Sequence, residues 1–255
     1  MSDTKNIAKN EFYREPLDFE LESTSLWSFP ERGSWATHNG DYRGNWSPYI
    51  PRNLILRYSI KNDYVLDPFL GSGTTLVEAK LLKRHGIGID INPKALEIAK
   101  KNLDFKAEPG YEPILIEGDA QKLFKIKNSS IDLICAHPPY SNIIKYSKDI
   151  KGDISLLDID DFLESISFVA KELYRVLKPN KYCAVLIGDI RKRGNVIPLS
   201  YMLMENFLYS GFLLKEIVIK SQHNCKSTKY WRDRSIKYNF LLLAHEYLFI
   251  FRKPL

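Results

Sequence analysis

Apolar residues lie mainly in short β-branched runs, which alternate with stretches whose apolar positions follow the helical period. The runs that predict strands are residues 64–66, 86–91, 114–116, 131–136 and 182–187. The stretches that predict helices are residues 74–84, 93–103, 160–177 and 199–209. Such an alternation predicts an α/β fold, with a mostly parallel sheet and helices on both of its faces.

The C-terminal part of the chain departs from this alternation. Two β-rich runs cover residues 212–219 and 240–251, and the sequence gives no sign of a helix between them. We therefore predict that they form an antiparallel hairpin at the edge of the sheet. The connection at residues 221–237 is longer than a hairpin requires, and we expect it to be a loop.

The N-terminal part follows neither period. Between Glu11 and Glu31 there are six acids and one base, which suggests an extended, partly ordered arm. Residues 32–51 combine Gly, Asn and Pro with four aromatic residues, so this loop either lines a site or packs on the core. We divide the chain into residues 1–45, an N-terminal arm and aromatic loop, and residues 46–255, one α/β domain.

Composition narrows the class of protein. Of the 255 residues, 37 are Lys or Arg and 31 are Asp or Glu, and this net charge of +6 fits a polyanionic partner without requiring one. The three cysteines form no C-x-x-C pair, so we expect neither a disulfide framework nor a metal site. No apolar stretch approaches the roughly 20 residues of a membrane span, and no signal peptide is seen. We expect a cytoplasmic protein with no membrane partner.

A glycine-rich turn joins the first predicted strand to the first helix that follows it. Its sequence is Asp67-Pro68-Phe69-Leu70-Gly71-Ser72-Gly73-Thr74. Glycines let the backbone approach a ligand, and the helix N-terminus faces that ligand. The turn is not a P-loop, because no Gly-Lys-Ser/Thr follows, and Leu76 replaces the third glycine of a dinucleotide motif. Alone, such a turn also serves as a plain connection.

Two acids at the ends of the next strands point to a cofactor. Asp90 can accept hydrogen bonds from both hydroxyls of a ribose, whereas a helix-capping role for it is less needed beside Asn92. Asp119 can accept one from the amine of an adenine. Ribose and adenine recognition without phosphate machinery indicates S-adenosylmethionine rather than ATP or NAD. The predicted cofactor-binding residues are Asp67, Pro68, Phe69, Gly71, Gly73, Thr74, Asp90, Ile91, Asp119 and Ala120.

The fourth predicted strand ends at the turn His137-Pro138-Pro139-Tyr140. Together with DPFLGSGTT, this turn resembles the amino-methyltransferases that modify adenine N6 or cytosine N4 of DNA, over residues 46–187. The resemblance implies a Rossmann-like class I methyltransferase fold for residues 46–255, with S-adenosylmethionine as the cofactor. The usual first residue of the turn in that family is Asp, Asn or Ser, and His137 departs from it.

The resemblance also implies roles for the turn. In the family, the first side chain and a following backbone carbonyl accept hydrogen bonds from the target amine, and here these are His137 and Pro138. Pro138 and Pro139 stiffen the turn, and Tyr140 stacks on the flipped base. A protonated imidazole cannot accept a hydrogen bond, so we expect activity to fall as the pH drops through the His137 titration. The alternative is that His137 only packs and the carbonyl acts alone.

The connection at residues 221–237 carries the charge expected of a DNA-contacting loop. Residues 215–237 contain seven Lys or Arg and two acids, and the basic residues are interleaved with aromatic ones. Basic side chains neutralise phosphates and aromatic ones stack on bases, although a solvated face is the plainer interpretation. The predicted DNA-binding residues are Lys226, Lys229, Tyr230, Trp231, Arg232 and Arg234.

The sequence therefore predicts a site-specific DNA methyltransferase that acts on an exocyclic amine of double-stranded DNA. Adenine N6 is preferred to cytosine N4. Alternatives are an RNA guanosine-N2 methyltransferase, a protein glutamine methyltransferase and a catalytically silent DNA-binding subunit. A homodimer, a partner recognition subunit and a cognate restriction enzyme, as in restriction-modification, all stay open.

Overall fold

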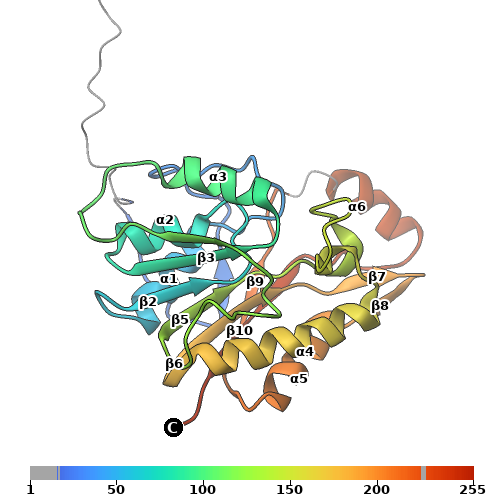
Figure 1. The fold of residues 1–255 in the computed structure, drawn as a ribbon. Helices are drawn as coiled ribbons and strands as arrows, with labels where there is room; N and C mark the ends of the chain where they lie inside the picture. The colour runs from blue at the N-terminus through green and yellow to red at the C-terminus, as the bar shows by residue number, and fades with distance from the viewer. Residues whose placement is uncertain (1–15, 17, 225–227) are drawn as a thin grey trace, which may run out of the picture.

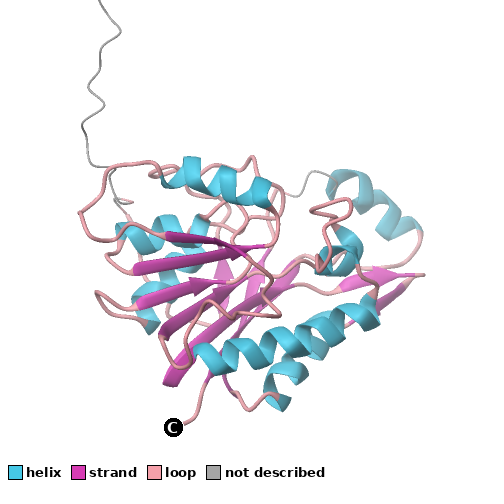
Figure 2. Cartoon of the chain, in the orientation of Figure 1, coloured by secondary structure: helices cyan, strands magenta, loops and turns pink. Residues whose placement is uncertain are grey.

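A twisted eight-stranded sheet forms the centre of the computed structural model, which describes residue 16 and residues 18–224 and 228–255 (Figures 1 and 2). The strand order is β1-β9-β10-β6-β5-β2-β3-β4. Only β10 runs antiparallel to its neighbours, β6 and β9. The bounds are β1 Leu26–Ser28, β2 Tyr64–Asp67, β3 His85–Asp90, β4 Ile114–Glu117, β5 Ile131–Ala136, β6 Leu177–Ile187, β9 Leu213–Ser221 and β10 His245–Arg252.

Helices cover both faces of this sheet, as predicted. On one face lie α1 (Tyr49–Tyr58) and α2 (Thr74–Leu81), with α3 (Pro93–Leu103) beside α2; on the other lie α4 (Ile159–Val176) and α5 (Leu199–Tyr209) (Figure 1). Successive residues of β5 show why the sheet needs a helical layer on each face. Leu133 and Cys135 pack in the cluster that includes α1, whereas Ile134 and Ala136 pack in the cluster that includes α4. Side chains of a strand alternate between faces, so this wholly buried strand serves both layers.

Local signals set several boundaries where the sequence predicts them. The predicted bounds of β5, α3 and α5 agree with the structure. At α3, the Asn92 side chain accepts a hydrogen bond from the Lys94 amide, and Pro93 occupies the first turn. Such a cap satisfies one of the free amides at a helix start, and proline there costs no hydrogen bond.

Two expectations about the C-terminal hairpin are wrong. β9 and β10 pair as predicted, but β9 is not at the edge, because β1 from the N-terminal arm runs parallel beside it. The connection between them is also not simply a loop, because it contains helix α6, Thr228–Lys237. The periodic signal arises only where one face of a helix is buried, and α6 is largely exposed along its length. Arg234 stacks over the Tyr230 ring at 4.2 Å, one turn away, which stabilises α6 locally.

Three smaller features complete the fold. A two-stranded sheet, β7 (Ile190–Lys192) and β8 (Asn195–Ile197), follows β6, and two short 3₁₀ helices, Ser141–Ile143 and Ile154–Leu156, follow β5. Among the described residues, no helix has the length and apolar character needed to cross a membrane.

Candidate active site

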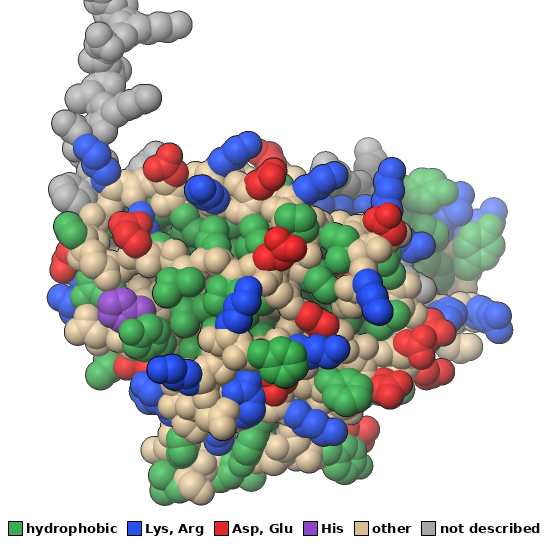
Figure 3. Space-filling view, in the orientation of Figure 1, with side chains coloured by type: hydrophobic (Ala, Val, Ile, Leu, Met, Phe, Trp, Pro, Cys, Tyr) green, Lys and Arg blue, Asp and Glu red, His purple; other side chains and the backbone are tan. Residues whose placement is uncertain are grey.

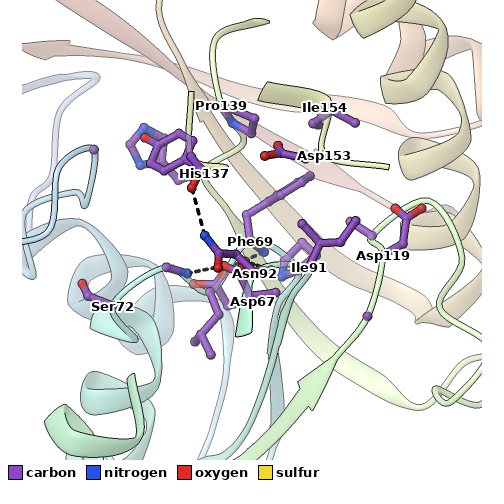
Figure 4. A pocket seen from close by; sticks show the side chains of 18 of the residues that line it. Asp67, Phe69, Ser72, Ile91, Asn92, Asp119, His137, Pro139, Asp153 and Ile154 are labelled. Atoms are coloured by element: carbon purple, nitrogen blue, oxygen red, sulfur yellow. Dashed lines mark hydrogen bonds between the residues drawn. The ribbon is translucent and has the colours of Figure 1, made fainter. Parts of the chain in front are cut away.

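A cavity opens at the carboxyl ends of β2, β3, β4 and β5 (Figure 4). It brings together two sets of residues that the sequence predicted separately. From the cofactor set, it is lined by Asp67, Pro68, Phe69, Gly71, Thr74, Asp90, Ile91, Asp119 and Ala120. His137 and Pro139 of the second turn line it as well, whereas Gly73, Pro138 and Tyr140 lie outside this lining.

The glycine turn is shaped by two positive φ angles. Gly71 has φ +52° and Gly73 has φ +86°, conformations that other residues rarely adopt. A Cβ on Gly71 would lie 3.1 Å from Cε1 of Tyr42, and one on Gly73 would lie 3.2 Å from Cβ of Ala99. Without a side chain, Gly71 leaves room for the Tyr42 ring in the cavity wall, and Gly73 lets the turn pack closely on α3.

Asp67 holds the start of this turn. Its carboxyl oxygens accept hydrogen bonds from the Phe69 amide at 3.0 Å and from the Thr75 hydroxyl at 2.5 Å. Burial raises the pKa of Asp67 to about 7, although both hydrogen bonds oppose the rise. Asp67 thus ties the end of β2 to the first turn of α2.

Asp90 links the turn to the next strand. Its Oδ2 accepts a hydrogen bond from the Gly71 amide at 2.8 Å, and its Oδ1 accepts one from the Asn92 amide at 2.9 Å. Burial raises the pKa of this carboxyl above its ordinary value, although the same hydrogen bonds favour the charged form. The Asn92 side chain donates to the carbonyl of Tyr146 at 2.9 Å, which fastens the segment after β5 over the cavity (Figure 4).

The segment after β5 forms a wall that the sequence did not predict. Gly152 adopts φ +94° and lies against Asp119, since a Cβ there would be 3.2 Å from Asp119 Oδ2. Asp119 in turn accepts a hydrogen bond from the Gln121 amide at 2.8 Å. The residues of this segment that line the cavity are Tyr146, Gly152, Asp153 and Ile154. The Gly152-Asp153 pair is a turn signal, but it does not reveal what the turn faces.

The aromatic loop lines the cavity and also packs on the core, so both expectations for it are met. Tyr42, Asn45 and Trp46 contribute to the cavity wall. Trp46 is only 5% exposed, and its ring stacks on the imidazole of His137, with centroids 5.5 Å apart and planes at 15°. The loop thereby covers one face of the residue that begins the second turn.

The surroundings of His137 keep its imidazole neutral. Its pKa is lowered to about 4, chiefly by burial; the charge of Glu246 opposes the fall, and Lys220 and Arg32 add to it. At pH 7 the ring therefore holds one proton and retains one lone pair. The sequence could not supply this value, because the groups responsible lie far from His137 along the chain.

Tyr140 is anchored through its hydroxyl. That hydroxyl donates to Glu246 Oε1 at 2.6 Å, and Glu246 Oε2 accepts from Lys220 Nζ at 2.8 Å. His137 Nε2 lies 3.1 Å from the same hydroxyl oxygen. Sequence reasoning missed Glu246 and Lys220, since a separation of 106 residues between Tyr140 and Glu246 leaves no local signal.

Four of the predicted DNA-binding residues, Tyr230, Trp231, Arg232 and Arg234, lie on α6, at an end of the molecule where basic and apolar side chains gather (Figure 3). Tyr230 is 56% exposed and Trp231 is 43% exposed. Arg191 of β7 stacks over the Phe240 ring at 5.3 Å and donates to the Leu241 carbonyl at 3.0 Å. The β7–β8 hairpin and the α6 segment therefore form one surface. Of the predicted set, Lys226 and the side chain of Lys229 lie outside the described residues.

Within the described part of the chain, no group of three or more His, Cys, Asp or Glu side chains is placed to hold a metal ion. Cys135 and Cys183 are buried free thiols. Cys225, which the sequence places near His223, lies outside the described residues.

The profile of a family described as DNA methylase matches residues 2–101 and 131–254, most of the chain. The chain belongs to this DNA methylase family, which confirms the resemblance seen in the two motifs. A second profile, described as RMKL-like methyltransferase domain, matches residues 54–153.

Individual relatives match over shorter segments. The type II methyltransferase M2.LlaDCHI of Lactococcus lactis subsp. cremoris is 53% identical over 62 residues, which are 24% of this chain and 23% of that protein. M2.DpnII of Streptococcus pneumoniae is 48% identical over 60 residues, 24% of this chain and 22% of that protein. A tRNA (guanine(10)-N2)-dimethyltransferase of Methanothermobacter thermautotrophicus is 33% identical over 125 residues, 49% of this chain and 35% of that protein. The matches thus span about a quarter to a third of these relatives.

Solved structures confirm the fold class. TrmN from Thermus thermophilus superposes with a TM-score of 0.58 at 19% identity, covering 83% of this chain and 50% of that one. A SAM-dependent methyltransferase from Methanosarcina mazei gives 0.56 at 18% identity, covering 79% and 97%. The [4+2]-cyclase SpnF gives 0.55 at 17% identity, covering 85% and 86%. The Rossmann-like methyltransferase fold is therefore shared, while the reaction has to be argued from the site.

Proposed function

We propose that this chain is a DNA methyltransferase that moves a methyl group from S-adenosylmethionine to an exocyclic amine, adenine N6 in preference to cytosine N4. One observation carries the proposal: the glycine turn with Asp90 and the His137 turn line the same cavity. A cofactor held by the first turn and a base presented to the second would share this space. Family membership supports methyl transfer to DNA.

The cavity has the features that S-adenosylmethionine requires. Gly71 lets the backbone approach the ligand, Asp90 offers carboxylate lone pairs to the ribose hydroxyls, and Asp119 offers them to the adenine amine. When bound, the cofactor supplies an electrophilic methyl group on a sulfonium sulfur.

The second turn prepares the nucleophile. An amine conjugated with a base ring is a poor nucleophile, and hydrogen-bond acceptors aimed at its N–H groups make its lone pair more available. A neutral His137 accepts one such bond, and the Pro138 carbonyl accepts the other. Pro138 and Pro139 hold both acceptors in place. Tyr140, with its hydroxyl fixed, offers a ring on which the flipped base stacks.

The joint surface of α6 and the β7–β8 hairpin contacts the DNA in this proposal. Both elements are adjacent in the chain to residues that contact Tyr140 of the second turn. A Cβ on Gly188, two residues before β7, would lie 3.0 Å from Cε2 of Tyr140, and β10, which follows α6, contains Glu246. Lys226, Lys229, Arg232 and Arg234 neutralise phosphates, and Tyr230 and Trp231 stack on or wedge between bases.

A second candidate is methyl transfer to guanosine N2 of RNA. The tRNA methyltransferase described above is similar over 49% of this chain. The same acceptor turn would serve a guanine amine. Incubation with radiolabelled S-adenosylmethionine and either unmethylated duplex DNA or unmodified tRNA separates the two. Label on DNA supports the proposal; label on tRNA alone replaces it with the second candidate.

A further inference from the structure

A chain of hydrogen bonds connects Lys220, near the end of strand β9, to His137. Lys220 on β9 donates to Glu246 on β10 at 2.8 Å, and Glu246 accepts from the Tyr140 hydroxyl at 2.6 Å. The hydroxyl oxygen lies 3.1 Å from His137 Nε2. Glu246 is only 7% exposed, so water competes little for these bonds. We call these four residues the Glu246 chain.

The protons that each group of the Glu246 chain carries decide which group donates and which accepts in each hydrogen bond. Burial raises the pKa of Glu246, but Lys220, His137 and the Tyr140 hydroxyl outweigh it, and its pKa lies below the ordinary value. Glu246 is thus a carboxylate that can only accept. A separation of 2.6 Å requires a proton between the two oxygens, and that proton belongs to Tyr140. The Tyr140 oxygen therefore presents only lone pairs to His137.

A lone pair on Tyr140 requires a proton on the nitrogen that faces it. We infer that Glu246, acting through Tyr140, holds His137 as the Nε2–H tautomer, so that Nδ1 carries the lone pair that accepts from the target amine. The geometry alone fixes the tautomer, whereas the role of Nδ1 rests on the proposed function. Glu246 and Lys220 are then positioning residues, which touch no substrate themselves.

The accessibility of Nδ1 agrees with this assignment. Among the described residues, none donates a hydrogen bond to Nδ1. Nδ1 is also absent from the buried side-chain atoms that lack a partner in that part of the chain, so it keeps contact with solvent. His137 is one of the residues that line the cavity (Figure 4).

Two tautomers matter only while the ring is neutral. The charged or titratable groups that act on His137 are Glu246 on β10, Lys220 on β9, Arg32 in the aromatic loop and Tyr140. Burial, with Lys220 and Arg32, lowers the pKa of His137 to about 4 against the opposing charge of Glu246, so the ring is neutral at pH 7. The choice between Nδ1 and Nε2 is therefore made by hydrogen bonding.

The substitution Glu246→Gln should reverse the tautomer. Lys220 Nζ can only donate, so the amide carbonyl of the new side chain turns toward Lys220 and its NH₂ group toward Tyr140. Tyr140 then accepts from that NH₂ group, and its own proton becomes free to point at His137 Nε2. The ring proton moves to Nδ1, and the group facing the cavity changes from an acceptor to a donor.

Nitrogen NMR of protein labelled in its five histidines tests the assignment without substrate. His137→Gln identifies the His137 signals by their absence. At pH 7 we expect an unprotonated Nδ1 and a protonated Nε2 in the unaltered chain, and the reverse in Glu246→Gln. Glu216→Gln, the same exchange at a half-exposed position on β9, should leave the signals unchanged. A protonated Nδ1 in the unaltered chain, or an unchanged tautomer in Glu246→Gln, overturns the inference.

A second variant and a double-mutant cycle distinguish a change of tautomer from a general loss of structure. Tyr140→Phe removes the oxygen that holds Nε2, so both tautomers should appear. For methyl transfer, Glu246→Gln should lower kcat about 100-fold, a typical contribution of one proton-accepting group. In a His137→Asp background it should have little effect, because a carboxylate accepts without regard to tautomer.

An equal loss in both backgrounds assigns Glu246 a structural role and overturns the inference. The two failures are distinguishable, because the spectra need no substrate. An unaltered chain that methylates no nucleic acid overturns the proposed function, while the spectra still decide the tautomer.

Discussion

Removal of the Trp46 ring should raise the pKa of His137. In Trp46→Ala, one face of the imidazole loses its stacked indole and gains water, and burial is the largest cause of the depressed pKa. The shift from the ordinary 6.5 to about 4 corresponds to about 3 kcal/mol at 1.36 kcal/mol per unit. Full exposure of the imidazole can therefore recover at most this amount of free energy.

The shift has a measurable effect on activity under mildly acid conditions. At pH 5.5, a group with a pKa of 4 is about 97% neutral, and one with a pKa of 6.5 is about 9% neutral. The unaltered chain should therefore keep its rate from pH 8 to about 5 and lose it near pH 4. In Trp46→Ala the acid limb should move up, with as much as a tenfold loss at pH 5.5.

The assay combines an NMR titration of the His137 ring with kcat measured against pH. Trp27→Ala is the matched control, because Trp27 is as deeply buried as Trp46 but lies in β1. It should lower stability without moving the His137 titration. The reasoning is refuted by a His137 pKa near 6.5 in the unaltered chain, or by one that stays near 4 in Trp46→Ala.

Three further predictions concern the cofactor turn and the DNA surface. Asp90→Asn should weaken S-adenosylmethionine binding about 10- to 100-fold in calorimetry, since hydrogen bonds to a charged group contribute about 1.5–3 kcal/mol; an unchanged Kd would remove Asp90 from the site. Gly71→Ala should lower the free energy of unfolding by about 1 kcal/mol and also weaken cofactor binding. Gly110 also has a positive φ, +96°, but a Cβ added there would meet nothing within 4 Å. Gly110→Ala should therefore lower the free energy of unfolding without weakening cofactor binding, and equal binding losses in the two variants would contradict the role of Gly71. Arg232→Ala and Arg234→Ala should each raise the Kd for DNA and reduce the salt slope by about 1, and an unchanged slope would place DNA elsewhere.

The α/β rhythm and both motifs could be predicted from sequence because they are local. Strands and helices with one buried face leave a period in the chain, and the turns after β2 and β5 follow directly from their residues. The acids after β3 and β4 line one cavity with the glycine turn, as expected of residues at the carboxyl ends of parallel strands, which meet at one edge.

The remainder depends on contacts between distant segments. The described side chains of α6 are largely exposed, so they leave no period, and Leu26 of β1 pairs with the distant Ile219 of β9. Glu246 and Lys220 meet Tyr140 only because β10 pairs with β6 and β9 pairs with β10. The sequence could not give the pKa of His137 either, because burial among distant segments lowers it to about 4.

The most direct measurement is nucleoside analysis of duplex DNA after incubation with labelled S-adenosylmethionine, using the unaltered chain and His137→Ala. We predict N6-methyladenine with the unaltered chain and a loss of about 100-fold or more with the variant. N4-methylcytosine would keep the mechanism and overturn the preferred base. No label on DNA, with cofactor binding intact, would contradict the proposed function.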